Sequence, residues 1–222
     1  MSTREEILRG LASRIAAIRP PHPVRVAIDG IDAAGKTTLA DELAPAIERH
    51  GRPVIRASID GFHNPRDARY RRGSLSPEGY FHDSFNYPAL IEALLQPLGP
   101  GGSLEFRRRA FDFRTDAPVA APSESAPADA VLLLDGVFLL RRELRDYFDF
   151  SIFVRVDVAE SLRRGQARDA GLFGGADEAR RRYEERYIPG QQAYLATEAP
   201  ERWASVILDN NDVAQPVIDR AG

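Results

Sequence analysis

One segment near the beginning of the chain limits the folds that the sequence can adopt. Residues 24–29 form an apolar, β-branched run that ends in an acid, residues 30–37 read Gly-Ile-Asp-Ala-Ala-Gly-Lys-Thr, and a helical pattern follows over 38–50. The spacing is G-x-x-x-x-G-K-T, and strand, loop and helix come in the order that this phosphate-loop motif requires. A glycine-containing turn with a chance Lys-Thr pair would not need that order. The segment therefore predicts an α/β fold with a phosphate site at the end of its first strand.

The residue types of this loop suit a polyphosphate ligand. Small residues let backbone N–H groups approach the phosphates, and the N-terminus of the next helix adds partial positive charge. Lys36 is expected to contact the β- and γ-phosphates, and the Thr37 hydroxyl is expected to bind Mg²⁺. ATP and Mg²⁺ are the predicted cofactors. The predicted nucleotide-binding residues are Gly30, Asp32, Ala33, Ala34, Gly35, Lys36, Thr37 and Thr38.

Length and composition narrow the remaining choices. The 222 residues suit one domain, predicted over 1–222 with a lid at about 163–186. The formal net charge of −3 gives no general attraction to nucleic acid, and no apolar run approaches the ~18 residues needed to span a bilayer. Cysteine is absent, which excludes disulfides and thiolate metal sites. We expect a cytoplasmic protein whose partner is a small molecule, not nucleic acid or a membrane.

The apolar patterns predict a doubly wound, mainly parallel sheet, because strands alternate with helices along the chain. Strands are expected at 24–28, 53–59, 131–134, 150–156 and 205–208. Helices are expected at 3–18, 38–50, 88–96, 141–148, 159–169 and 177–199, with a short one from about 212. Three segments lack such patterns and are expected to be a long functional loop at 64–87, a strand or hairpin arm within 104–113, and a surface excursion at 116–130.

Two carboxylates follow predicted strands. Asp60 comes after the second strand, where it could accept a proton from an attacking hydroxyl, and Asp135 comes after the buried run 131–134, where phosphate-loop enzymes hold an acid for Mg²⁺. Each acid also precedes a glycine, so each could simply form a turn. The buried strand favours the metal role for Asp135, whereas the two interpretations of Asp60 stay balanced at this point.

Arginines and aromatic residues supply the remaining candidates. Six arginines in the predicted lid could meet charge on a transferred phosphoryl group, and one or two are expected to do so while the others pair with acids on the helix surface: Arg163, Arg164, Arg168, Arg180, Arg181 and Arg182. Rings and polar groups in the loop after Asp60 could bind a substrate, and about half are expected only to pack: Phe62, His63, Tyr80, Phe81, Asp83, Phe85, Asn86 and Tyr87. His63 and His82 lack partners at metal-ligand spacing, which disfavours a zinc site.

Several short segments together resemble the superfamily of uridine kinase, phosphoribulokinase and bacterial pantothenate kinase. They are the phosphate loop, Asp60-Gly61-Phe62, Ser84-Phe85-Asn86-Tyr87-Pro88, Ala110-Phe111-Asp112-Phe113, Asp135-Gly136-Val137 and the arginine-rich lid. The resemblance covers about 24–209 and implies phosphoryl transfer from ATP to a hydroxyl of a small molecule. It also implies that Asp60 is the catalytic base and that Lys36, Arg164 and Arg168 are catalytic, although one extra residue in the lid helix could put Arg163 in the place of Arg164.

The same resemblance implies an acceptor site made of Asp60, Phe62, His63, Tyr80, Phe85, Asn86, Phe111, Phe113 and Asp116. Uridine kinases usually have Asp, Tyr and His where this chain has Asn86, Phe111 and Asp116, and Glu where it has Asp135. Residues 60–65, 72–73 and Tyr80 look more like pantothenate kinases.

The acceptor is therefore open among a nucleoside, which uridine kinase-like enzymes use, pantothenate and a sugar. The phosphate loop is also similar to that of thymidylate kinases, but the Asp60-Gly61-Phe62 turn fits the nucleoside kinase group better, and the N-K-x-D signature of a GTPase is absent. A regulatory module that only binds ATP is the alternative from another class, although binding alone needs neither Asp60 nor lid arginines. Related kinases commonly self-associate, so a homo-oligomer is also an expectation.

Overall fold

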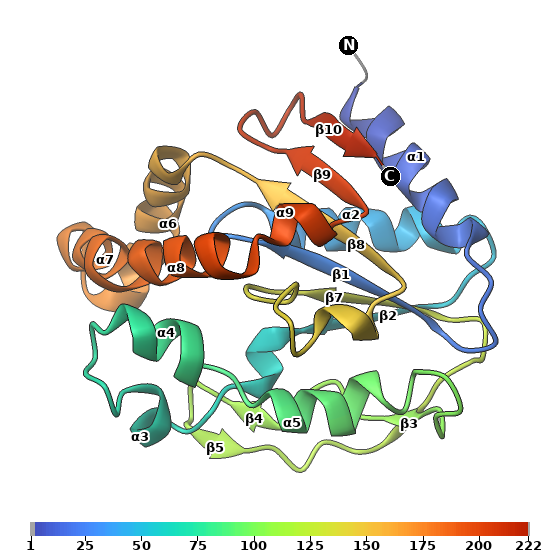
Figure 1. Cartoon of the computed structure of the whole chain (residues 1–222), viewed down its shortest axis with the longest axis horizontal. Helices are drawn as coiled ribbons and strands as arrows, with labels where there is room; N and C mark the ends of the chain where they lie inside the picture. Colours follow the sequence, from blue (N-terminus) through green and yellow to red (C-terminus); the bar gives the residue numbers. More distant parts are fainter. Residues whose placement is uncertain (1–2, 222) are drawn as a thin grey trace.

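The computed structural model describes residues 3–221, with side chains described for residues 3–220. Residues 1, 2 and 222 of the predicted domain lie outside the described residues. The central sheet has six strands in the order β10-β9-β8-β1-β7-β2 (Figure 1). They are β1 (Val24–Gly30), β2 (Val54–Ser58), β7 (Val131–Asp135), β8 (Phe150–Arg155), β9 (Val206–Asp209) and β10 (Val217–Ala221). Only the last pair, β9 and β10, is antiparallel, so the predicted doubly wound and mainly parallel sheet is confirmed.

Helices and short strands complete the fold. The helices are α1 (Arg4–Ala17), α2 (Lys36–Glu48), α3 (Arg66–Arg69), α4 (Pro77–Asp83), α5 (Tyr87–Leu90), α6 (Val158–Phe173), α7 (Ala176–Arg182), α8 (Ile188–Glu198) and α9 (Pro200–Trp203). Tighter or wider helical turns are η1 (Ile59–Phe62), η2 (Ile91–Leu95), η3 (Arg145–Tyr147) and η4 (Tyr183–Tyr187). Two small antiparallel pairs lie outside the main sheet, β3 (Glu105–Phe106) with β6 (Glu124–Ser125) and β4 (Phe111–Asp112) with β5 (Ala117–Pro118).

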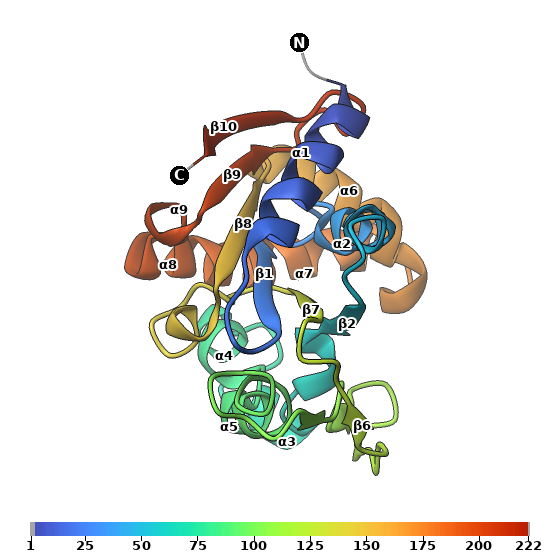
Figure 2. The same cartoon turned by 90° about the vertical axis from the view of Figure 1, so that its right-hand side faces the viewer.

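Both faces of the main sheet are covered, which explains why its central strands are apolar throughout. Successive side chains of a strand point to opposite faces. Val131 and Leu133 accordingly pack in one core with α1 and α2, whereas Leu132 and Leu134 pack in a second core with α5 and α8. The view in Figure 2 shows α1 and α2 on one side of the sheet and α4 and α5 on the other. No helix within residues 3–221 has the length and apolarity needed to cross a membrane.

Most predicted elements are present within one to four residues of their expected limits, but two predictions are wrong. The expected helix at 141–148 is only the turn η3, because Arg141 turns inward to bond the Tyr87 hydroxyl and the Phe81 carbonyl instead of starting a helix. The expected terminal helix from 212 is the strand β10, whose Ile218 pairs with Leu208 and packs on the core. In both places a contact distant in sequence outweighs local helix propensity.

The loop at 64–87 contains the short helices α3 and α4, in agreement with a long ordered loop. The predicted helix at 177–199 is one helical path with a π-turn, η4, at its centre. That turn lies just before Pro189, which lacks the N–H that a regular helix would use. Figure 1 shows α6 and α7 at the same end of the sheet as the carboxyl ends of β1 and β8, where open α/β sheets bind their ligands.

Candidate active site

The loop between β1 and α2 has the backbone of a phosphate cradle. Gly30 has φ 151° and Gly35 has φ 94°, and a Cβ at these positions would lie 2.4 Å from the Val154 carbonyl oxygen and 2.6 Å from Asn210 Nδ2. Both glycines are therefore required by conformation and by space. Lys36 begins α2 and its Nζ donates to the Ile31 carbonyl at 2.7 Å, which folds the lysine along the loop.

The predicted metal residues meet although they are far apart in sequence. Ile28 of β1 and Ser58 of β2 are both in register with Asp135 of β7, so the parallel strands bring this acid to the loop edge. Thr37 Oγ1 donates to Asp135 Oδ2 at 2.7 Å, and Arg56 Nη2 contacts Asp135 Oδ1 at 3.0 Å. A hydroxyl and a carboxylate are oxygen donors of the kind that Mg²⁺ prefers, so this pair fits the ion.

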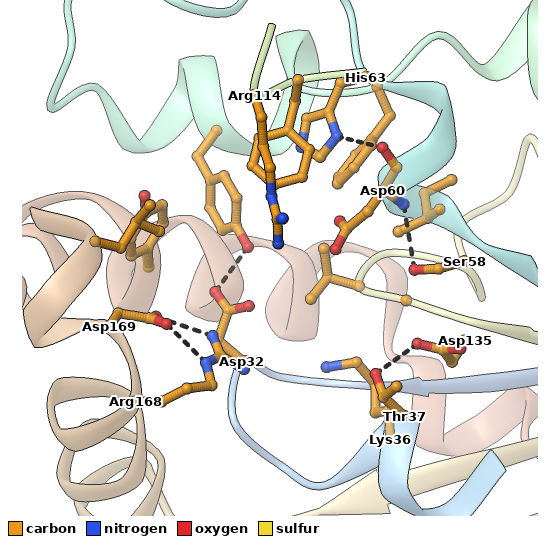
Figure 3. A pocket seen from close by; sticks show the side chains of 18 of the residues that line it. Asp32, Lys36, Thr37, Ser58, Asp60, His63, Arg114, Asp135, Arg168 and Asp169 are labelled. Carbon is orange, nitrogen blue, oxygen red and sulfur yellow. Dashed lines mark hydrogen bonds and ion pairs between the residues drawn. The ribbon is translucent and has the colours of Figure 1, made fainter. Parts of the chain in front are cut away.

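Asp60 lies across the cleft from the phosphate loop, in η1 directly after β2 (Figure 3). Its backbone N–H donates to Ser58 Oγ at 3.3 Å, while its carboxylate faces the cavity and is accessible to solvent. Burial by the cleft walls raises the pKa of Asp60, the carboxylates of Asp32 and Asp135 act in the same direction, and His63 opposes them. A carboxylate with a raised pKa at the mouth of a phosphate site is suited to accept a proton.

Gly61 explains the geometry of this turn. A Cβ at Gly61 would lie 2.7 Å from the Arg109 Cβ and 3.0 Å from the Arg108 carbonyl oxygen, so the loop segment before β4 runs directly over it. The Ala110 N–H donates to the Gly61 carbonyl at 2.8 Å and fixes that approach. The segment that carries β4 is thereby joined to the turn that carries Asp60.

Part of the predicted acceptor set lines a cavity of about 510 Å³ beside Asp60: His63, Tyr80, Phe85 and Phe113. The His63 ring lies 4.5 Å from Phe85 and 4.9 Å from Phe113, between centroids. Burial lowers the pKa of His63, and the neighbouring Asp60 carboxylate opposes that shift. The Tyr80 hydroxyl donates to Asp32 Oδ2 at 2.7 Å and ties the acceptor wall to the phosphate loop.

Other predicted acceptor residues have structural partners instead of facing this cavity. Phe62 is fully buried in the core, and Asn86 caps α5 by accepting the Ala89 N–H at 3.0 Å. Asp116 pairs with Arg69 at 2.9 Å and accepts the Arg66 N–H. Phe111 is 7% exposed and lines a neighbouring pocket. The set that the resemblance assigns to a nucleoside is thus only partly assembled around the cleft.

The lid arginines fall into two groups in the structure. Arg164 and Arg168 line a second pocket of about 540 Å³ over Lys36 and Thr37. Arg164 Nη2 donates to the carbonyls of Asn210 at 3.0 Å and Asn211 at 2.8 Å, and Arg168 pairs with Asp169 at 2.8 Å.

The remaining lid arginines pair with acids along their own helices and line neither pocket. Arg163 pairs with Glu160, Arg180 with Glu184, Arg181 with Glu185 and Arg182 with Glu178. Arg163 thus lies outside the pocket over Lys36, whereas Arg164 lines it.

Sequence reasoning missed Arg114, which lines the cleft, and two buried residues behind its wall, Gln191 and Arg186. Gln191 of α8 donates to Asp32 beside Tyr80, and Arg186 of η4 is buried and donates to the Ser76 carbonyl at 3.1 Å. Arg114 follows Phe113 and reaches into the cavity from the β4–β5 hairpin (Figure 3). An arginine directly after a predicted acceptor residue was the one available signal; nothing local marks the other two.

No family model matches the chain. It is 26% identical to uridine-cytidine kinase B of Dictyostelium discoideum over 69% of this chain and 61% of that protein. It is 27% identical to uridine kinase of Lactobacillus helveticus over 86% of this chain and 90% of that enzyme. It is 24% identical to pantothenate kinase of Streptococcus thermophilus over 90% of this chain and 67% of that enzyme.

Solved structures give the same class. A possible uridine kinase from Bacillus stearothermophilus superposes with a TM-score of 0.72 at 23% identity, over 91% of this chain and 97% of that one. A candidate fructose transport system kinase from Silicibacter sp. has a TM-score of 0.72 at 25% identity, over 86% of this chain and 95% of that one. The fold is that of P-loop kinases. The resemblance to the kinase group that includes uridine and pantothenate kinases, expected from the sequence, is confirmed, and the relatives support a kinase of small molecules.

Proposed function

We propose that this protein is an ATP- and Mg²⁺-dependent kinase that transfers the γ-phosphoryl group to a hydroxyl of a small molecule. The observation that carries the proposal is the pairing of Thr37 with Asp135 beside Lys36, with Asp60 facing them across the cavity. A module that only binds ATP does not require an acid with a raised pKa opposite the phosphate loop.

The chain's own residues divide the work of the reaction. The backbone of residues 30–38 and Lys36 hold the phosphates, and Thr37 and Asp135 hold the metal ion. When bound, Mg²⁺ supplies positive charge that offsets the charge developing on the phosphoryl oxygens. Asp60 accepts the proton of the acceptor hydroxyl as that oxygen forms its bond to phosphorus and the bond to the ADP leaving oxygen breaks. Arg164 and Arg168 lie on the nucleotide side, where they stabilise the transferred charge.

The acceptor is the finer part of the proposal. Relatives named for uridine and for pantothenate support two candidates, with a simple sugar as the third. Aromatic rings at His63, Phe85 and Phe113 suit a planar base. However, Asn86 and Asp116 are occupied by structural partners, which weakens the case for a nucleoside.

The test is product formation. Purified protein is incubated with Mg-ATP and separately with uridine, cytidine, pantothenate and simple sugars, and the products are identified by mass spectrometry. A phosphorylated acceptor whose formation is lost in Asp60→Asn supports the kinase. Measured ATP binding without any phosphorylated product favours the regulatory module.

A further inference from the structure

The neighbouring pocket that Phe111 lines adjoins the cavity at Asp60 and is rich in arginine. Its volume is about 510 Å³, and Thr37, Ser58, Asp60, Phe113 and Arg114 line both spaces. Four arginines reach its walls, namely Arg56, Arg108, Arg109 and Arg114, against the two acids Asp60 and Asp112. Arginines therefore outnumber acids in the pocket wall on this side of Asp60.

Two of these arginines are already neutralised. Arg56 pairs with Asp41 at 2.8 Å and with Asp135 at 3.0 Å, and Arg108 pairs with Glu124 at 2.8 Å. These contacts account for the charge of both side chains, and they hold the pocket wall in shape. Neither residue needs a ligand.

Arg114 and Arg109 are different. Among the described residues 3–221, neither guanidinium group has a hydrogen bond or an ion pair. The backbone N–H of Arg114 and, to a smaller extent, the charge of Arg109 lower the pKa of Asp112. The Arg114 guanidinium lies beside the Phe113 ring, with its Cζ 5.9 Å from the ring centroid. Figure 3 shows the Arg114 side chain entering the cavity from the hairpin above Asp60. An arginine without a partner on a cavity wall offers a fork of N–H donors that matches a carboxylate or a phosphate.

This pair of arginines is not needed by the nucleotide. The nucleotide pocket has its own cations, Lys36, Arg164 and Arg168, and neither Arg114 nor Arg109 lines it. Acids also outnumber cations around the main cavity, since Asp32, Asp60, Asp135 and Asp169 face Lys36, Arg168 and Arg114. An anionic acceptor could approach the triphosphate only if a separate positive group offset the repulsion, and the hairpin wall supplies one.

We propose that Arg114 and Arg109 form a binding site for a negatively charged group of the acceptor, so that the acceptor is a hydroxylated carboxylate or phosphate and not a neutral molecule. The inference rests on the proposed kinase function and names the class of its acceptor. Asp60 and Arg114 line one cavity, so one small molecule can place its hydroxyl at the acid while its anionic group lies at the hairpin. Arg114 and Arg109 are binding residues, not groups that act on the transferred phosphate.

The test compares three acceptors under steady-state conditions with Mg-ATP: uridine as the neutral acceptor, pantothenate as the carboxylate and ribose 5-phosphate as the sugar phosphate. We expect at least one anionic acceptor to exceed uridine in kcat/KM by ~10-fold or more. The better of the two shows whether the site binds a carboxylate or a phosphate. Arg114→Gln should lower that kcat/KM by ~10–100-fold, mainly through KM, because a charge-assisted contact is lost. Arg109→Gln should have a smaller effect in the same direction.

Controls separate this effect from damage to the fold. Arg107→Gln changes an exposed arginine of the same segment that lines neither pocket, and its kinetics should match the unmodified protein. Arg114→Lys keeps the charge and should restore part of the loss. Circular dichroism should be unchanged in all variants, since neither guanidinium is paired.

The outcomes are distinguishable. If uridine is the better acceptor and is indifferent to Arg114→Gln, the anion site is wrong and the kinase proposal stands. If Arg114→Gln lowers kcat equally for every acceptor at constant KM, Arg114 acts on the transferred phosphate and the anion site is again wrong. If no acceptor yields product although ATP binds, the proposed function fails, and the inference fails with it.

Discussion

The two halves of the cleft are built in different ways. The phosphate half is mostly contiguous, because β1, the loop and the start of α2 together occupy residues 24–38, while Asp135 joins them from β7 and Arg164 and Arg168 join them from α6. The acceptor half is assembled from η1, α4, the hairpin of β4 and β5, and the helices after α6. A contiguous site is specified by local sequence, whereas an assembled site depends on contacts between distant segments. Variants should therefore affect the two halves unequally.

The largest effect should come from Lys36. Lys36→Ala removes the charge that faces the phosphates, and we expect phosphoryl transfer to fall by ~10³-fold. Lys36 is the only lysine in the sequence, so a nucleotide acyl phosphate should acylate this side chain and ATP should block the reaction, as read by peptide mass spectrometry. Burial lowers the pKa of Lys36, which favours the reactive amine. Wild-type kinetics in Lys36→Ala would falsify the role of the loop.

Asp60→Asn tests the junction between the halves. We expect kcat to fall by ~10²-fold or more, because the proton acceptor is lost. ATP binding, measured by titration calorimetry, should be retained because Asp60 lies outside the nucleotide pocket. Arg107→Gln, which changes an exposed arginine that lines neither cavity, is the control and should keep most activity. Full turnover in Asp60→Asn would remove this acid from the mechanism.

The same acid predicts a pH dependence. The ordinary pKa of aspartate is 3.8, and burial by the cleft walls raises that of Asp60 above it. Since the base acts when deprotonated, kcat/KM should fall by ~10-fold per pH unit as the pH drops through this raised pKa. The midpoint of this fall in kcat/KM should lie above pH 3.8, and the fall should be absent in Asp60→Asn. A pH profile that is identical in the variant contradicts the assignment.

A smaller effect should separate packing from chemistry in the acceptor half. Gly61→Ala puts a methyl group where the Arg109 Cβ and the Arg108 carbonyl already lie, so the hairpin must move. We expect a loss of ~1–3 kcal/mol in the free energy of unfolding and a raised acceptor KM with unchanged ATP affinity. Gly10→Ala is the matched control, since a Cβ there meets nothing within 4 Å in α1, and urea unfolding should show a gain of ~0.5–1 kcal/mol.

The smallest effect should come from the outer face of the lid. Arg180 is exposed and pairs only with Glu184 in the part of the chain that the structure describes. Arg180→Gln should change stability by less than ~0.5 kcal/mol and turnover by less than ~2-fold, since exposed pairs contribute little. Arg168→Gln, on the face over Lys36, should lower kcat far more. Equal effects of the two substitutions would contradict the division of the lid arginines.

The phosphate half of the cleft could be predicted from the sequence, whereas much of the acceptor half could not. Residues 30–38, Asp60 and Asp135 could be located because each follows a recognisable strand, and parallel strands of a sheet end at a common edge. Asn86, Phe111 and Asp116 could be named only by resemblance, and in the structure Asn86 and Asp116 have partners within the protein. Asp116, for example, pairs with Arg69 across 47 positions, and no pattern within either segment indicates this contact.

The sequence by itself determined the sheet, the phosphate loop and the two acids at its edge. Hydrophobic periodicity and glycine spacing are local properties, so these features can be recognised without knowing which segments meet. Only the tertiary structure decided that Gly61 supports the hairpin, that Tyr80 and Gln191 hold Asp32, and that the Arg114 guanidinium enters the cavity with no polar partner among residues 3–221. Each of these depends on the approach of side chains that are distant in sequence, and such approaches follow from the packing of the whole core.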